Sequence, residues 1–167
     1  MSAELVELIR TELRAQADPE RAPGMQAYMK SSMPYLGVQV PNVRRLTRAA
    51  ALRYPPADLE GLRQSAAALW REAEFREERY AATELTGLRM ATGRLELLGL
   101  WREMIVTGAW WDHVDAVAHR IGDLLVAHRD DNMVGMMQGL VQQENNNSVR
   151  LKLEKALRDM NASPGRF

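Results

Sequence analysis

The sequence predicts an all-α protein that folds as a right-handed stack of antiparallel helix pairs. Apolar residues recur at helical spacing along almost the whole chain, and short connections containing proline or glycine separate the periodic segments. Short connections make consecutive helices antiparallel neighbours. The helix pairs recur at a spacing close to the roughly 40–47 residues of HEAT and armadillo repeats, which favours an α-solenoid.

The individual helices follow from this periodicity in order along the chain. Leu5, Ile9 and Leu13 form the apolar stripe of a first helix over residues 3–16. The segment ADPERAPG comes next, and its two prolines and one glycine predict a turn. Further helices are expected over 25–32, 41–53, 56–71, 74–89, 92–107, 112–128, 131–143 and 148–160.

The segment MPYLGVQVP, residues 33–41, is the most strand-like part of the chain. Because no other segment is suited to pair with it, we predict a structured loop there. We expect residues 1–167 to form a single HEAT-like helical-repeat domain. Its C-terminal repeats are expected to be incomplete, because the chain stops soon after a new repeat opens.

Composition excludes several classes of protein and of site. Hydrophobic residues make up 46% of the 167 and charged residues 26%, as in ordinary soluble domains. No apolar run approaches the roughly 18–20 residues that span a bilayer, and the N-terminus lacks the apolar core of a signal peptide. The chain has no cysteine, and its three histidines lack metal-ligand spacing. We therefore expect a cytoplasmic protein without membrane contact or metal. We also expect it to be a monomer, which composition does not address.

The charges cancel overall, but arginines gather in one segment. The 22 basic and 22 acidic residues balance, whereas the stretch between Pro41 and Arg53 has no acidic residue. Its basic residues are all arginines, whose forked guanidinium suits contacts with phosphate. Such a stripe on a neutral protein fits a polyanion over a limited footprint. The alternative is a solvated, arginine-rich helix face, which the charges alone favour. The arginines are Arg44, Arg45, Arg48 and Arg53.

The segment GAWWDHVDAV, residues 108–117, admits a structural interpretation. Asp112 is a suitable N-cap for the helix that follows, since its carboxylate can accept from an early backbone N–H. Asp115, three positions later, can complete an arrangement like a capping box, and Trp111 can act as a hydrophobic staple. These residues therefore have structural roles available.

The same segment also admits a functional interpretation. On a helical wheel, Asp115 lies at the margin of the apolar face, beside Ala118 and His119 and near Gly122. This half-buried surface of small residues is one that another molecule can approach. The adjacent tryptophans offer faces that attract cations, so the carboxylate and the aromatic wall suit a positively charged ligand. The residues alone favour capping and leave this site as the alternative.

Three segments, in this order along the chain, resemble the AlkD-like family of DNA alkylation repair proteins, which are DNA glycosylases built from HEAT-like repeats. The third contains Trp-Trp-Asp-x-Val-Asp, the most diagnostic element of that family. The resemblance extends over about residues 3–130. The segments are MQAYMKSSMPYLGVQVPNVRRL (25–46), LWREAEFREERYAA (69–82) and VTGAWWDHVDAVAHRIGDLL (106–125).

The resemblance implies an activity. Family members hydrolyse the N-glycosidic bond of positively charged alkylpurines, such as 7-methylguanine or 3-methyladenine, in double-stranded DNA. They use no cofactor, and the cationic base needs no general acid. A carboxylate in the cleft stabilises the oxocarbenium-like sugar and orients the attacking water.

The resemblance also implies roles for particular residues. Asp115 and Trp111 match the carboxylate and the aromatic wall that line the cleft against the lesion, and Trp110 is the first tryptophan of the pair. Tyr28 and Gln39 match residues that approach the same cleft. In an open helical stack, Arg44, Arg45 and Arg48 would face the DNA phosphates.

The sequence departs from the family near its C-terminus. The family's Asp-Asn-x-Trp-x-x-Arg motif falls on ENNNSVR, residues 144–150, where Asn147 replaces the tryptophan and Arg150 keeps the arginine. The alternative function is therefore a catalytically inactive HEAT-like scaffold that binds DNA or another protein. A further alternative is a fragment that self-associates through its methionine-rich segment.

Overall fold

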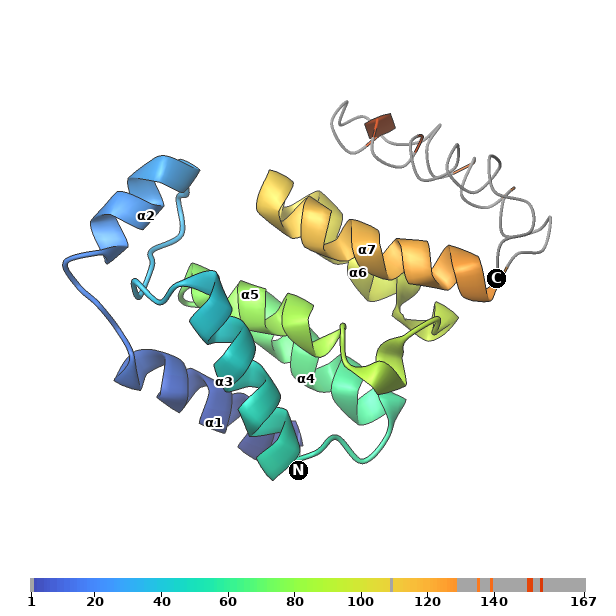
Figure 1. The fold of residues 1–167 in the computed structure, drawn as a ribbon, viewed down its shortest axis with the longest axis horizontal. Coiled ribbons are helices and arrows are strands. Elements are labelled where there is room, and N and C mark those ends of the chain that lie inside the picture. Colours follow the sequence, from blue (N-terminus) through green and yellow to red (C-terminus); the bar gives the residue numbers. More distant parts are fainter. Residues whose placement is uncertain are drawn as a thin grey trace. The chain divides into compact units, whose positions relative to one another are not determined.

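The computed structural model describes residues 2–108 and 110–128, together with Gly135, Gly139, Arg150, Leu151 and Glu154. All regular elements of this part of the chain are helices, which confirms the all-α prediction (Figure 1). The arrangement of the helix pairs as a right-handed solenoid stays a prediction, as does the single domain over 1–167. The helices expected over 131–143 and 148–160, and the incomplete repeats, fall outside the described residues apart from these five positions.

The described helices follow one another with short connections. The 3₁₀ helices are η1 (Arg89–Ala91) and η2 (Leu95–Leu97). The α-helices are α1 (Ser2–Ala15), α2 (Ala22–Met29), α3 (Val40–Arg53), α4 (Leu59–Arg71), α5 (Arg76–Leu85), α6 (Leu98–Gly108) and α7 (Trp111–Ala127).

Three predicted helix starts are wrong, each for a local reason. The α2 helix begins at Ala22, inside the predicted turn, because Pro23 fits the first turn of a helix. The α4 helix begins at Leu59, since Asp58 caps it by accepting the Gly61 N–H at 2.8 Å. The helix expected over 92–107 begins only at Leu98, because the chain first turns at Gly93 with φ +68° and then forms η2.

The predicted loop between α2 and α3 is confirmed. Residues 31–39 contain neither helix nor strand and lead directly into α3. Pro41 lies in the first turn of α3, where its missing N–H costs nothing.

The contacts of the chain group into two compact units, Met1–Ala91 and Thr92–Phe167. In the first unit, α1 packs on α3, α4 and α5, and α5 also packs on α3 and α4. The predicted stripe of α1 is fully buried there, as are large side chains of α4. In the second unit, α6 packs on α7. The largest buried side chains of the first unit are Leu5, Ile9, Leu13, Leu62, Leu69, Trp70 and Leu85, and those of the second are Leu97, Trp101, Met104, Leu124 and Leu125.

No helix within the described ranges is both long enough and apolar enough to cross a membrane.

Candidate functional site

The start of α7 differs from the predicted capping arrangement. Trp110 is the N-cap, with extended φ −141° and ψ 149°, and its carbonyl accepts the Val114 N–H at 3.1 Å. Asp112 therefore lies inside the first turn, where its Oδ1 accepts the N–H of the next residue, His113, at 2.9 Å. Asp115 falls in the second turn, beyond the reach of a capping box. The predicted N-cap at Asp112 is thus wrong, and capping does not account for Asp115.

The two tryptophans of this segment lie at the surface. The exposed fraction is 36% for Trp110 and 52% for Trp111, whereas the core tryptophans Trp70 and Trp101 are each 1% exposed. A staple residue precedes the N-cap, whereas Trp111 follows it as the first residue of α7, so the predicted staple role of Trp111 is wrong. Exposed neighbouring tryptophans are typical of surfaces that contact a ligand.

The surroundings of Asp115 agree with the helical-wheel prediction for the apolar face of α7 but differ from it for Asp115 itself. The predicted apolar face of α7 is buried, but Asp115 itself is exposed rather than half-buried. Gly122 has open space beside it, because a Cβ built there would meet no described atom within 4 Å. Packing among the described residues therefore gives no reason for this glycine. The buried face consists of Val114, Val117, Ile121, Leu124 and Leu125.

Two other predicted site residues lie in the first unit, at either end of the loop 31–39. Tyr28 is 78% exposed on α2. Gln39 is exposed and is the N-cap of α3, but its side chain makes no capping hydrogen bond. Both side chains are therefore presented to solvent, in keeping with a binding role.

A buried carboxylate on α5 fixes the loop that carries Gln39. Glu77 is fully buried and accepts the backbone N–H groups of Leu36, Gly37 and Val38 at 3.0, 2.9 and 3.1 Å. Burial raises the pKa of the Glu77 carboxyl, and the three N–H bonds, which favour the charged form, offset only part of that rise. Glu77 was not predicted as a site residue, because the spacing along the chain does not reveal which loop a helix contacts.

The opposite side of the loop is held by the turn between α1 and α2. The Asp18 N–H donates to the Leu36 carbonyl at 2.8 Å, and Arg21 Nη1 donates to the Gly37 carbonyl at 3.2 Å. The hydroxyl groups of Tyr35 and Tyr80 share a hydrogen bond of 2.9 Å. The loop is therefore fastened on both sides, which sets the position where α3 begins.

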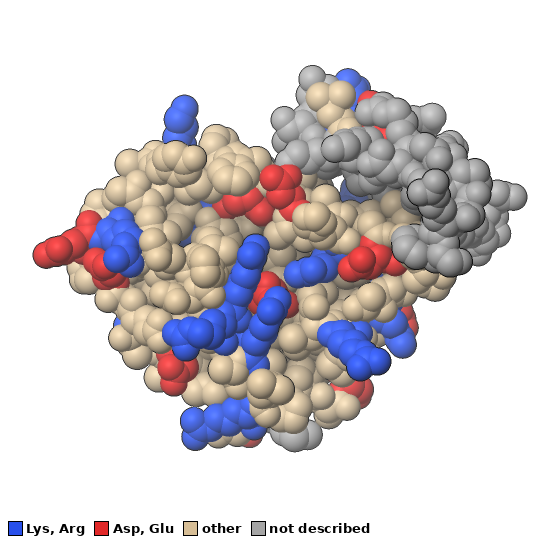
Figure 2. All heavy atoms as spheres, viewed as in Figure 1, with Lys and Arg blue, Asp and Glu red and all other residues tan. Residues whose placement is uncertain are grey.

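Arg44, Arg45 and Arg48 form an exposed basic surface on α3, which we call the α3 arginine surface. Figure 2 shows basic side chains gathered over α3 in the first unit, with acidic atoms between them. The acid in contact is Glu84 of α5, whose Oε1 lies 2.6 Å from both Nε and Nη2 of Arg48. Its Oε2 lies 3.7 Å from Nε of Arg44. The predicted exposure of the arginines is confirmed, but the acid beside them was not foreseen.

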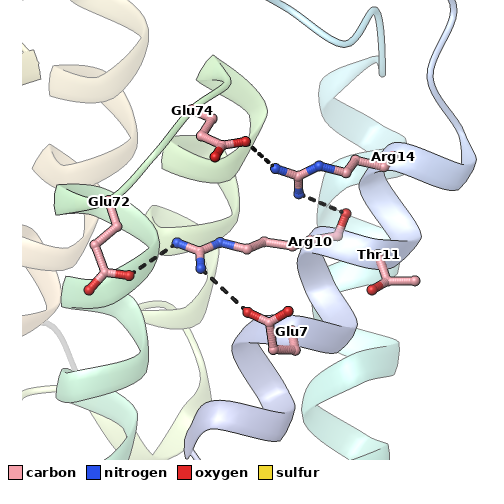
Figure 3. Close-up of a pocket in the computed structure, with 6 residues that line it drawn as sticks. All are labelled: Glu7, Arg10, Thr11, Arg14, Glu72 and Glu74. Atoms are coloured by element: carbon pink, nitrogen blue, oxygen red, sulfur yellow. Dashed lines mark hydrogen bonds and ion pairs between the residues drawn. The ribbon is translucent and has the colours of Figure 1, made fainter.

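A polar pocket of about 440 Å³ opens between α1 and the turn from α4 to α5 (Figure 3). Its guanidinium groups are engaged by acids: Arg10 contacts Glu72 at 3.4 Å, and Arg14 contacts Glu74 at 2.6 Å. Both arginines also contact the buried Glu78, at 3.2 Å each. The pocket therefore belongs to an ion-pair network that joins α1 to α5, and it contains none of the predicted site residues. Its lining is Glu7, Arg10, Thr11, Arg14, Glu72 and Glu74.

The predicted residues divide between the two units. The second unit contains Trp110, Trp111, Asp115 and Arg150; Arg150 is exposed on a helical position, with its Nε 3.7 Å from Oε1 of Glu154. Within the described ranges, no cluster of three or more acidic or histidine side chains is arranged to hold a metal ion. The first unit contains Tyr28, Gln39, Arg44, Arg45 and Arg48.

Comparison with known proteins supports the resemblance read from the motifs. A family model described as DNA alkylation repair enzyme matches residues 9–151, which include every predicted site residue. A comparison with curated proteins gives no match. The family match covers most of the chain, both units included, and the chain therefore belongs to the family of AlkD-like DNA alkylation repair enzymes.

Proposed function

We propose that the protein is a monofunctional DNA glycosylase that releases positively charged alkylpurines, such as 7-methylguanine or 3-methyladenine, from duplex DNA. Membership of a DNA alkylation repair family supports a DNA substrate. The observation that carries the proposal is the pairing of an exposed tryptophan with an exposed carboxylate on one face of α7. Trp111 and Asp115 are four residues apart in the same helix, so their side chains are neighbours on its surface.

The chemistry needs little from the protein beyond this pair. The alkylated base already carries a positive charge, so the electrons of the breaking C1′–N bond neutralise it as it leaves. The sugar then becomes oxocarbenium-like, and the Asp115 carboxylate stabilises that positive charge. The same carboxylate orients a water molecule, which attacks C1′ and releases a proton to the solvent, leaving an abasic site. The exposed face of Trp111 favours both the cationic base and the cationic sugar.

The remaining predicted residues bind the DNA. The α3 arginine surface contacts backbone phosphates, because arginine forks suit phosphate oxygens. Tyr28, Gln39 and Trp110 support the lesion-containing strand with their exposed side chains, and Arg150 adds a further contact with DNA. The protein acts as a monomer on this substrate, without a metal or cofactor.

The test is release of 7-methylguanine from methylated duplex DNA by the parent protein, Asp115→Asn and Asp112→Asn. Asp112→Asn is the matched control, because it removes the same charge from the same helix but from a residue outside the proposed site. We expect Asp115→Asn to lose about 100-fold or more of the activity, as when a preorganised electrostatic group is removed. Asp112→Asn should stay within several-fold of the parent.

Three results would count against the proposal. Equal losses in both variants would mean that Asp115 has no special role. Salt-sensitive duplex binding without any base release by the parent would select the inactive scaffold, since phosphate contacts alone give that behaviour. No binding and no release would rule out both the glycosylase and the scaffold that binds DNA. Circular dichroism and urea unfolding of each variant separate loss of chemistry from loss of fold.

A further inference from the structure

We propose that Glu84 weakens the binding of the α3 arginine surface to the phosphates of the DNA backbone. This inference rests on the proposed function, because it takes the arginines to contact phosphate. Glu84 lies on α5, its side chain is only 7% exposed, and it meets two of the three arginines.

The geometry shows how one carboxylate contacts two guanidinium groups. Oε1 of Glu84 lies 2.6 Å from Nε and from Nη2 of Arg48, and Oε2 faces Nε of Arg44 at 3.7 Å. The guanidinium groups stay accessible, since the side chains of Arg44 and Arg48 are 57% and 64% exposed. The acid therefore lies on the inner side of the arginines, while their outer edges face solvent.

This arrangement leaves donors for phosphate but reduces the charge behind them. A guanidinium has five N–H donors, and Arg48 directs its Nε–H and one Nη2–H toward Glu84. A phosphate bound to the outer edge would meet a guanidinium that a carboxylate already neutralises. Attraction to the phosphate is weaker for such a pair than for an unpaired cation, because the carboxylate repels the phosphate.

Arg45 provides the contrast within the same surface. Among the described residues it pairs with no carboxylate, and its Nη2 reaches the neutral Gln16 Oε1 at 3.4 Å. The surface thus combines one arginine that keeps its full charge with two that share the charge of Glu84. A repair enzyme must leave undamaged DNA to find a lesion. A weaker contact with phosphate lets it dissociate from undamaged DNA more readily.

The first experiment compares the parent with Glu84→Gln for binding to a short undamaged duplex across salt concentrations, by fluorescence anisotropy. We expect Glu84→Gln to bind about threefold to tenfold more tightly at low salt. The slope of log affinity against log salt should become steeper by up to about 0.9, the contribution of one phosphate contact. The matched control is Glu60→Gln, which changes net charge equally but breaks a pair with Arg63 on the surface of α4. It should shift the affinity by less than about twofold.

A second experiment leaves Glu84 in place and so does not depend on folding of the Glu84 variant. Arg45→Ala should lose more duplex affinity than Arg48→Ala, because only Arg48 is paired with an acid in the free protein. Both side chains are at the surface, so both variants are expected to fold. Equal losses, or a larger loss for Arg48→Ala, would overturn the inference.

A double variant distinguishes action through the arginines from a general charge effect. In an Arg44→Ala, Arg48→Ala background, Glu84→Gln should change affinity by less than about twofold, since no arginine then holds a phosphate close to the Glu84 carboxylate. A full effect in that background would overturn the inference. If the parent binds duplex with salt dependence but Glu84→Gln is no tighter, the inference fails and the proposed function stands. If the parent shows no such binding, both fail.

Discussion

The carboxylate of Glu77 on α5 accepts the backbone N–H of Gly37, 40 residues earlier in the chain, at 2.9 Å. The same carboxylate accepts the flanking N–H groups of Leu36 and Val38. One buried side chain thereby satisfies three loop donors that the helices leave unpaired. The loop leads into α3, so this contact sets where Gln39 and the α3 arginine surface are presented.

Removing that carboxylate should destabilise the protein strongly. Glu77→Ala leaves three N–H groups without their acceptor in a buried position, and each unsatisfied buried donor costs about 1–3 kcal/mol. Water entering the vacated space recovers part of this cost. We therefore expect the free energy of unfolding to fall by about 3 kcal/mol in urea denaturation.

Glu60→Ala is the control for this prediction. Glu60 is an exposed acid on α4 that pairs with Arg63, and its removal should leave the free energy of unfolding close to that of the parent, because exposed ion pairs contribute little. Similar small losses in both variants would show that the loop does not depend on Glu77.

The raised pKa of Glu77 makes a prediction about pH. Burial raises the pKa of this carboxyl above its ordinary value of 4.5 in the folded protein. The folded state therefore binds the proton more tightly than the unfolded state. The resulting contribution to the free energy of unfolding is complete below pH 4.5 and is lost as the pH rises through the pKa of Glu77 in the folded protein.

Glu77→Gln removes this titration while keeping the size of the side chain. The free energy of unfolding of the parent, taken relative to the variant, should therefore be larger at pH 4 than at pH 7. Urea unfolding of both proteins between pH 4 and pH 7 measures the difference between their free energies of unfolding. The titration of the other groups cancels in this difference. A difference that stays constant with pH, or grows toward pH 7, would contradict a raised pKa.

Gly37 and Gly122 should respond in opposite ways to replacement by alanine. Gly37 has φ +90°, and a Cβ there would clash with the backbone carbonyl of Asp18. Gly37→Ala should therefore lose about 3 kcal/mol or fail to fold. Gly122 lies within α7, and no described atom lies within 4 Å of its Cβ position, so Gly122→Ala should gain up to about 1 kcal/mol from helix propensity. Thermal melting of the Gly37→Ala and Gly122→Ala variants tests the two expectations. A melting temperature lowered by Gly122→Ala would show a close contact at that glycine.

Periodicity predicted those parts of the fold that depend on a single helix. The stripe of α1 and the apolar face of α7 are buried as expected, because burial follows the 3.6-residue repeat. The predicted N-cap of α7 was wrong, since Asp112 is a good N-cap by residue type but Trp110 is the N-cap and its carbonyl accepts the Val114 N–H. Several adjacent residues could begin this helix, and the choice among them depends on packing.

Contacts between distant segments could not be predicted in the same way. The sequence indicated an arginine-rich face on α3, but not that Glu84 would lie beside it. The pairing of α3 with α5 arises from the tertiary packing of the first unit. Glu77 and Glu84 are seven residues apart, which places them on one face of α5. That pattern marks a shared face without identifying its partner, so the loop and the arginines were linked to α5 only by the structure.

The tryptophans should separate into structural and functional types on truncation. Trp101 is 1% exposed in the core of the second unit, so Trp101→Ala should lose about 3–5 kcal/mol of unfolding free energy. Trp111 is 52% exposed, so Trp111→Ala should lose no more than about 1 kcal/mol. Under the proposed function, Trp111→Ala should nevertheless release 7-methylguanine at least about tenfold more slowly, because the aromatic face beside Asp115 is gone. Urea unfolding and base release measured on the same preparations test this. A stable Trp111→Ala protein with parental activity would remove Trp111 from the site and leave Asp115 to be tested on its own.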